Sequence, residues 1–252
     1  MTMSVRRCAQ LAAWGTAWLA GSAAFDEVLD AVTTSARDTA GSGFESTALH
    51  PVGSALTDWR RSGTSCLRLV LPVAGDVRGL AGEPAFRTAA LTAGDAVYGN
   101  EFGLTVAEGR PTPSSAGQQV LWHRAEFADR PADHISLADA EHDLAEAIRD
   151  TASLFARRGA ASWLSDIAPA LSDARRAGER LHLPASHPPR GVRLVAQAER
   201  LAAVLTVVDA DDTGELTATA MQERAIALAP LRIAVRRGLL AGYNAAAEMA
   251  DS

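Results

Sequence analysis

The stretch that decides the fold is residues 67–86, which read LRLVLPVAGDVRGLAGEPAF. Its first part, residues 67–73, is almost continuously apolar, as expected of a strand that is buried on both faces. Residues 74–82 contain three glycines and are predicted to form a loop. Pro84 then stands where the first turn of a helix accepts proline. The stretch therefore predicts a strand, a glycine-rich loop and a helix in succession.

The helix after this loop is indicated by apolar residues at helical spacing. They are Phe86, Ala90, Ala93 and Val97. Gly99 and Asn100 both tolerate the left-handed conformation, so we expect the helix to stop there. Residues 102–107 and 118–127 have strand character, and the turn-rich segment between them predicts a hairpin. The region therefore predicts a small sheet of about three strands.

The N-terminal segment carries one apolar stripe, which predicts a single helix over residues 5–32. The stripe consists of Leu11, Trp14, Trp18, Phe25, Val28, Leu29 and Val32. Arg6 and Arg7, followed by an apolar stretch that ends near residues 22–24, also resemble an export signal. Because the stripe continues past this cleavage point, we favour a structural helix and a cytoplasmic location, with export as the alternative. No stretch reaches the ~18 uninterrupted apolar residues of a membrane span.

The rest of the chain is predicted to be helical. Ser136 and Asp139 resemble a capping box at the start of a helix that continues to residue 158. Further helices are expected at 161–180 (one or two short ones), 191–208 and 219–248. Residues 34–50 read as a loop and residues 52–61 as a short helix.

These elements predict an α+β fold that is predominantly helical. Residues 1–130 are expected to hold the N-terminal helix and the small α/β region. Residues 131–252 are expected to form a helical, bundle-like region. The two parts are either two domains or one continuous domain.

Composition excludes several classes of protein. The chain has 252 residues, a formal net charge of −6, and no lysine, so all 24 basic residues are arginine. This acidic balance argues against a dedicated nucleic-acid binder. Cys8 and Cys66 are the two cysteines, and they form neither a disulfide framework nor a CxxC motif. We expect reduced thiols, as is usual in the cytoplasm.

The glycine-rich loop is the candidate ligand site. Backbone N–H groups near Gly75, Gly79 and Gly82, ahead of a helix N-terminus, are suited to binding an anion. Arg78 and Arg87 lie close by in sequence and are able to add charge-assisted hydrogen bonds. The spacing matches neither GxGxxG nor GxxxxGK[ST]. A tight turn that needs glycine is therefore the alternative interpretation.

Catalytic and metal-binding motifs are not found in the sequence. GxSxG and HExxH do not occur, and His134 and His142 are eight residues apart. The acidic turn 209–215 resembles a calcium loop, but Ala220 stands where the bidentate glutamate is needed. We therefore assign no catalytic residue, no metal site and no cofactor.

Three segments carry a resemblance to a known family. They are AWGTAWLAG (13–21), LRLVLPVAGDVRGLAGEPAF (67–86) and PPRGVRLVAQAERLA (188–202). Over most of its length the chain resembles a family of conserved hypothetical proteins from actinobacteria. That family has no assigned activity, so the resemblance implies no catalytic residues.

The leading functional hypothesis is a non-catalytic cytoplasmic binding or adaptor protein. Its partner is another protein or a second copy of the chain, and neither nucleic acid nor a membrane is expected. One alternative is an enzyme or a nucleotide- or anion-binding protein that uses the loop at residues 74–87. A further alternative is a helical subunit of a larger complex.

Overall fold

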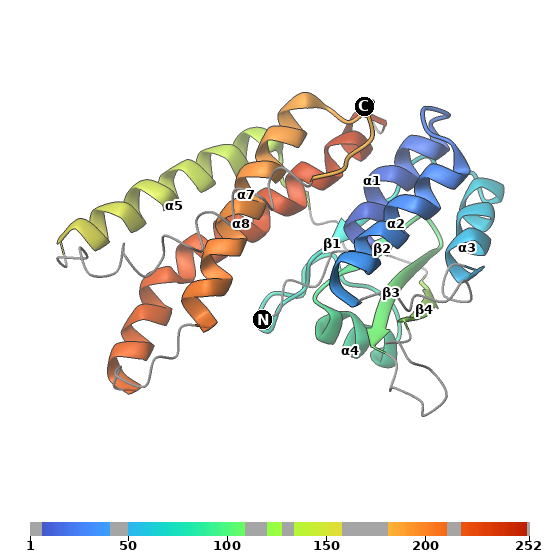
Figure 1. Cartoon of the computed structure of the whole chain (residues 1–252). Coiled ribbons are helices and arrows are strands. Elements are labelled where there is room, and N and C mark those ends of the chain that lie inside the picture. Colours follow the sequence, from blue (N-terminus) through green and yellow to red (C-terminus); the bar gives the residue numbers. More distant parts are fainter. Residues whose placement is uncertain are drawn as a thin grey trace. The chain divides into compact units, whose positions relative to one another are not determined.

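The computed structural model describes residues 7–40, 50–108, 120–127, 134–157, 181–210 and 218–250. The chain divides into two compact units (Figure 1). The sheet unit comprises the described residues up to His134, together with 182–188 and 243–250. The helical unit comprises the described residues of 135–181 and 189–242. The fold is α+β and predominantly helical, as the sequence predicts.

The sheet unit begins with two helices, α1 (Arg7–Leu19) and α2 (Phe25–Ala40), and not with one. Gly21 adopts a φ of 76° just after α1. The Gly21 N–H donates to the Trp18 carbonyl, and the Ser22 N–H donates to the Ala17 carbonyl. This pair of bonds is a Schellman motif, which ends a helix at a left-handed glycine. The prediction of a single helix over 5–32 was therefore wrong, although the apolar stripe runs through both helices.

The remaining elements of the sheet unit follow in chain order. They are α3 (His50–Arg61), β1 (Arg68–Val70), α4 (Pro84–Ala93), β2 (Ala96–Tyr98), β3 (Phe102–Glu108) and β4 (Val120–Glu126). The four strands form an antiparallel sheet in the order β1-β2-β3-β4. The predicted hairpin is confirmed, because Phe102 of β3 lies opposite Glu126 of β4 and the pairing continues to Glu108 and Val120.

The sequence pattern did not predict the fourth strand, β2, because Val97 lies at helical spacing behind Phe86. Gly94, with a φ of 80°, ends α4, and its N–H donates to the Ala90 carbonyl 2.8 Å away. Val97 consequently belongs to a strand, where it lies opposite both Leu69 and Leu104. Gly99 serves a different purpose from the expected helix stop. A Cβ there would lie 2.3 Å from Trp59 Cδ1, so only glycine fits against the buried indole.

Both faces of the sheet are covered within the sheet unit. Helix α1 is buried from Cys8 to Trp18, and the Cys8 thiol donates to the Leu104 carbonyl of β3. Gly15 of α1 packs against Leu67, the residue just before β1. A Cβ at position 15 would lie 2.5 Å from Leu67 Cδ1, so glycine permits this close approach. A second apolar cluster gathers α4, the loop before it and the strands. Its members are Val70, Leu80, Ala81, Phe86, Ala90, Ala96, Tyr98 and Ala125.

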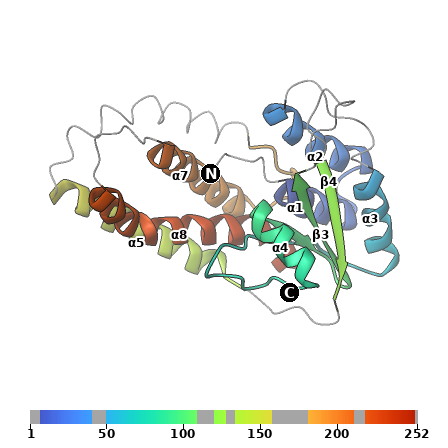
Figure 2. The same ribbon diagram turned by 90° about the horizontal axis from the view of Figure 1, so that it is seen from below.

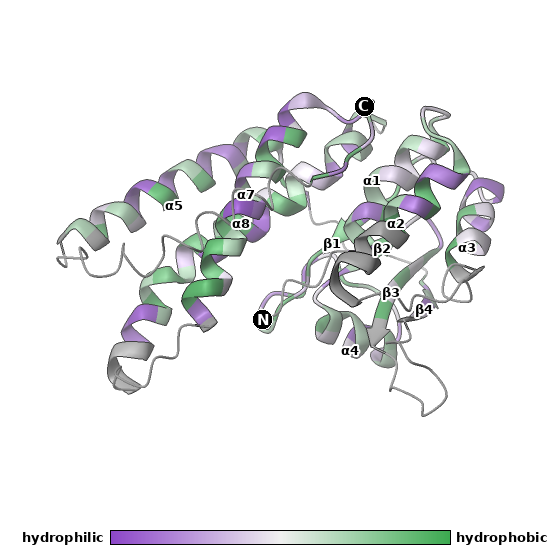
Figure 3. Cartoon of the chain, in the orientation of Figure 1, coloured by the Kyte–Doolittle hydropathy of each residue, from purple (hydrophilic) through white to green (hydrophobic). Residues whose placement is uncertain are grey.

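The helical unit contains α5 (Leu137–Arg157), α7 (Pro189–Ala210) and most of α8 (Ala218–Ala250). The predicted cap of α5 is confirmed, since the Asp139 N–H donates to Ser136 Oγ over 3.1 Å. Hydrophilic and hydrophobic segments alternate along α5 (Figure 3), as expected of a helix with one buried face. The short helices predicted at 161–180 lie outside the described residues.

Candidate functional site

The glycine-rich loop after β1 is a pair of tight turns. Val73 and Asp76 exchange backbone hydrogen bonds of 3.0 and 2.9 Å around Gly75, whose φ is 87°. A second turn follows, in which the Leu80 N–H donates to the Val77 carbonyl near Gly79, whose φ is 74°. The N–H groups of Val73, Asp76 and Leu80 are therefore engaged within the loop.

Arg78, the first predicted ligand-binding cation, is paired inside this loop. Its Nε donates to Asp76 Oδ1 over 2.9 Å, and its Nη2 donates to Asp76 Oδ2 over 2.8 Å. Arg87 is exposed on α4, and its backbone N–H donates to the Glu83 carbonyl. An incoming anion would have to compete with Asp76 for the Arg78 guanidinium. Anion binding by this loop stays a prediction.

Gly82, the third predicted loop glycine, is needed for packing. Its φ is 102°, and a Cβ there would lie 3.1 Å from Phe86 and 3.3 Å from Ala125. The Tyr98 hydroxyl accepts a hydrogen bond from the Ala81 N–H and donates one to the Ala81 carbonyl. This end of the loop is thus fastened to the interior of the sheet unit, which supports the turn interpretation of the glycines.

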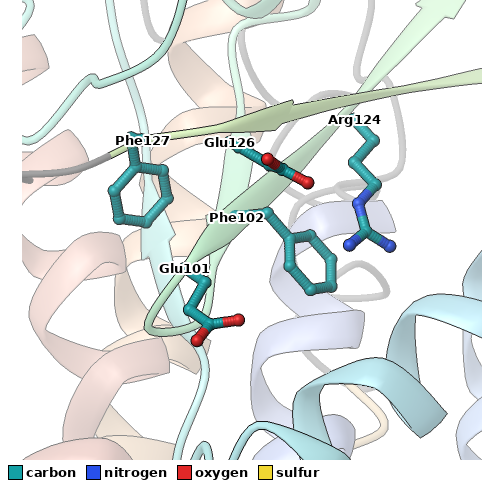
Figure 4. A pocket seen from close by; sticks show the side chains of 5 residues that line it. All are labelled: Glu101, Phe102, Arg124, Glu126 and Phe127. Atoms are coloured by element: carbon teal, nitrogen blue, oxygen red, sulfur yellow. The ribbon is translucent and has the colours of Figure 1, made fainter.

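A concave pocket lies at another place, where the turn into β3 meets the end of β4. It has a volume of about 480 Å³ and is lined by Glu101, Phe102, Arg124, Glu126 and Phe127 (Figure 4). The Phe127 N–H donates to the Glu101 carbonyl over 3.0 Å, which joins the two segments that form the pocket. None of the five lining residues carries a hydroxyl, thiol or imidazole group. Its polar groups are the two carboxylates of Glu101 and Glu126 and the guanidinium of Arg124.

A stack of three flat groups supports the floor of the pocket. The Phe102 ring lies parallel to the fully buried Trp59 ring, with centroids 4.8 Å apart. The Arg124 guanidinium carbon lies 3.6 Å from the centroid of the Phe102 ring, within the range of a cation–π contact. Arg124 Nη1 also donates to Asp58 over 2.6 Å. These contacts hold the Phe102 ring and the Arg124 guanidinium in place.

The residues that line the pocket carry two carboxylates and one guanidinium, so its charge is negative. Asp58 bonds to both Arg61 and Arg124, and the hydrogen bond from Arg124 holds the pKa of the Asp58 carboxyl below its usual value. The exposed carboxylates of Glu101 and Glu126 remain, and Figure 4 shows them on opposite sides of the Phe102 ring. Two exposed carboxylates against one guanidinium favour a cationic group over an anion.

Beside the pocket, β4 presents an open sheet edge. The bond from the Phe127 N–H to Glu101 sets the alternation of the ladder, so the odd-numbered residues of β4 face β3. The backbone N–H and C=O groups of Trp122, Arg124 and Glu126 consequently point away from the sheet. Within the described residues no strand lies beyond β4, which Figure 2 shows as the last strand.

The sequence predicts residues 118–127 only as a strand and does not predict the pocket beside β4. The pattern that could have indicated the pocket is the alternation that puts Trp122, Arg124 and Glu126 on one face of that strand. Phe102 and Glu101 join them only through the register of the hairpin. In the described part of the chain, no group of three or more histidine, cysteine or acidic residues is arranged to hold a metal ion.

Comparison with known proteins decides the family. The N-terminal domain of the Rv1486c-like proteins matches residues 8–135, and their C-terminal domain matches residues 138–240. The chain belongs to the Rv1486c-like family. The resemblance to actinobacterial proteins of unassigned function is thereby confirmed. The division of the chain near residue 130 into two domains stays a prediction.

The relatives of this Rv1486c-like protein come from mycobacteria. It is 29% identical to "Uncharacterized protein Rv1486c" of Mycobacterium tuberculosis over 277 residues, covering 93% of this chain and 95% of the relative. It is 26% identical to "Uncharacterized protein ML1804" of Mycobacterium leprae, with the same coverage. These names assign no activity, so they lend no catalytic residue. No solved structure matches the chain.

Among the helices of the described residues, none combines the length and the apolar character that crossing a membrane requires.

Proposed function

We propose that this protein is a non-catalytic adaptor that binds an extended segment of a partner protein along β4. The observation that carries the proposal is the open edge of β4 beside the pocket, with the backbone groups of Trp122, Arg124 and Glu126 facing outward. An extended chain that adds to such an edge gains main-chain hydrogen bonds, while a pocket beside it selects a side chain.

The pocket supplies the side-chain selectivity of this adaptor. A basic side chain of the partner enters between Glu101 and Glu126, and its aliphatic part lies against the Phe127 ring. The carboxylates would repel a phosphate group, which supports a protein partner over a nucleic acid. The Arg124 guanidinium, held by Asp58 and Phe102, forms the fixed end of the pocket.

A cytoplasmic location is part of this proposal. Cys8 and Cys66 are buried and form no disulfide, and burial raises the pKa of the Cys8 thiol, which disfavours its reactive thiolate. Helix α1, which an export signal would include, is buried from Cys8 to Trp18 in the core of the sheet unit. Both observations support a protein that keeps α1 and works in a reducing compartment.

The proposal is tested with two fluorescent octapeptides. Both alternate valine and threonine, and they differ only in a central arginine or glutamate. We expect the arginine peptide to raise the fluorescence anisotropy on addition of protein, and the glutamate peptide to bind more weakly. Glu126→Pro should abolish binding, because it removes an outward N–H that the protein's own sheet does not use.

The matched control for this variant is Glu146→Ala on α5, an exposed glutamate of the helical unit. It should bind the arginine peptide as the wild type does. The proposal is overturned if neither peptide binds at millimolar concentration. It is also overturned if a folded Glu126→Pro variant, checked by circular dichroism, binds as well as the wild type.

A further inference from the structure

We propose that the partner of the β4 edge is a second copy of this chain, which adds its own β4 antiparallel about a two-fold axis at Ala125. This inference rests on the proposed function, because it uses the same open edge. It names the occupant of that edge and predicts which residues lie opposite one another.

Backbone geometry limits how two β4 strands can pair. The even-numbered residues of β4, which are Val120, Trp122, Arg124 and Glu126, direct their N–H and C=O groups outward from the sheet. In an antiparallel ladder, two residues that face each other with these groups exchange two hydrogen bonds. Two copies related by a two-fold axis must therefore place one of these even-numbered residues opposite another.

Charge then selects the register. With Arg124 opposite the partner's Glu126, the two-fold axis repeats the same pair of opposite charges on the other side of Ala125. A shift that places Arg124 opposite the partner's Arg124 brings two guanidinium groups together. The opposite shift brings Glu126 against the partner's Glu126. Opposite charges directly across a strand pair stabilise it and like charges destabilise it, so the first register is favoured among the three that place charged residues opposite each other.

The residue on the axis fits this register. Ala125 would face the partner's Ala125 in a non-hydrogen-bonded pair, where side chains approach most closely. The side chain there is a methyl group, already buried on the α4 side of the sheet near Gly82. The other edge of the sheet offers no such place, because Asn244 bonds to both outward backbone groups of Leu69 on β1.

The strength of this association follows from its size. The two Arg124–Glu126 pairs supply two main-chain hydrogen bonds each, together with two contacts between opposite charges. This is a small interface, of the kind found in transient complexes. We therefore expect reversible self-association that is visible only at high protein concentration.

Sedimentation velocity of the full chain, from micromolar to millimolar concentration, tests the inference. We expect the wild type to shift from monomer to dimer. Arg124→Glu and Glu126→Arg should each remain monomeric at the top concentration, because each puts like charges in register. An equimolar mixture of the two variants should form a heterodimer, since every facing pair is then again of opposite charge. Glu146→Arg, with the same charge change on α5, should dimerise as the wild type does.

The outcomes separate this inference from the proposed function. A wild type that stays monomeric while the arginine peptide still binds overturns the second copy as partner and leaves the adaptor function standing. If Arg124→Glu and Glu126→Arg each still dimerise, the proposed register is wrong and the inference is overturned. Because Arg124→Glu also loses the Asp58 pair, its melting temperature is measured first, and failure of the two folded variants to associate on mixing overturns the inference.

Discussion

The side-chain amide of Asn244 completes the edge of β1 by binding both backbone groups of Leu69. The Leu69 N–H donates to Asn244 Oδ1 over 2.7 Å, and Asn244 Nδ2 donates to the Leu69 carbonyl over 3.0 Å. The two residues are 175 positions apart in the chain, and both are buried. One side chain from the end of α8 thus takes the place of a neighbouring strand.

This relationship makes the two edges of the sheet different. Sheet edges with free backbone groups invite pairing with other chains, and proteins commonly cover them. Here the outward groups of Leu69 are satisfied, whereas those of Arg124 and Glu126 face away from the sheet. The difference is the basis for assigning partner binding to β4.

Replacement of Asn244 by alanine should reduce the stability of the protein. The change leaves the buried N–H and C=O of Leu69 without their partner, which costs about 2–4 kcal/mol in free energy of unfolding. Urea denaturation followed by circular dichroism measures this loss. Asn100→Ala, at an exposed asparagine, should change the free energy by no more than about 0.5 kcal/mol. Equal effects of the two substitutions would contradict the role of Asn244.

Replacement of Trp18 by alanine tests whether the N-terminal helix belongs to the core. Trp18 is 8% exposed, meets the Phe25 ring edge to face, and has the Arg60 guanidinium 3.4 Å above its ring. Its loss should lower the free energy of unfolding by about 3–5 kcal/mol. Thermal and urea unfolding measure the change. A nearly neutral substitution would instead indicate a partner-binding stripe on α1.

The ion pair between Asp58 and Arg124 should make stability depend on pH. Because Arg124 lowers the pKa of the Asp58 carboxyl in the folded state, the charged carboxylate stabilises that state. This contribution is present above the unfolded pKa of about 4 and is lost as the pH falls through the folded value. Urea unfolding of wild type and Asp58→Asn over a pH series should give curves that converge in acid. Curves that stay parallel down to the lowest pH would show that Asp58 contributes nothing through its charge.

The anion hypothesis for residues 74–87 makes a prediction about Asp76. An anion that binds there must take the Arg78 guanidinium from Asp76, so Asp76→Ala should strengthen the response to phosphate or sulfate. Melting temperature against millimolar anion measures it. The Arg78→Ala, Arg87→Ala double variant should lose the response. If neither wild type nor Asp76→Ala is stabilised by any anion, the loop is a turn and nothing more.

Elements stabilised by neighbouring residues were predictable from the sequence. The cap of α5 needs only Ser136 and Asp139, three positions apart, and the structure contains it. The β3–β4 hairpin joins strands that follow each other in the chain, so strand character and a turn-rich connection were sufficient. The fold class follows from the same local patterns.

Two errors show where local patterns mislead. The apolar stripe of the first helix continues through Phe25, but the Gly21 Schellman motif divides it into α1 and α2. Val97 lies at helical spacing behind Phe86, but it pairs with Leu69 and Leu104 across the sheet. A periodic pattern reports which residues are buried, and it does not show which backbone groups bond to one another.

What the sequence by itself determined is therefore the α+β class, the hairpin, the helical second half and the family. What only the tertiary structure decided is the site. The register of the hairpin places Glu101 and Phe102 beside Arg124 and Glu126. Asn244 bonds to Leu69, which lies 175 positions earlier in the chain. Helix caps and hairpins join residues that are close in sequence, so short sequence patterns encode them. The distant contacts form only when the whole sheet unit folds, because its packing must offset the entropy lost in bringing remote segments together.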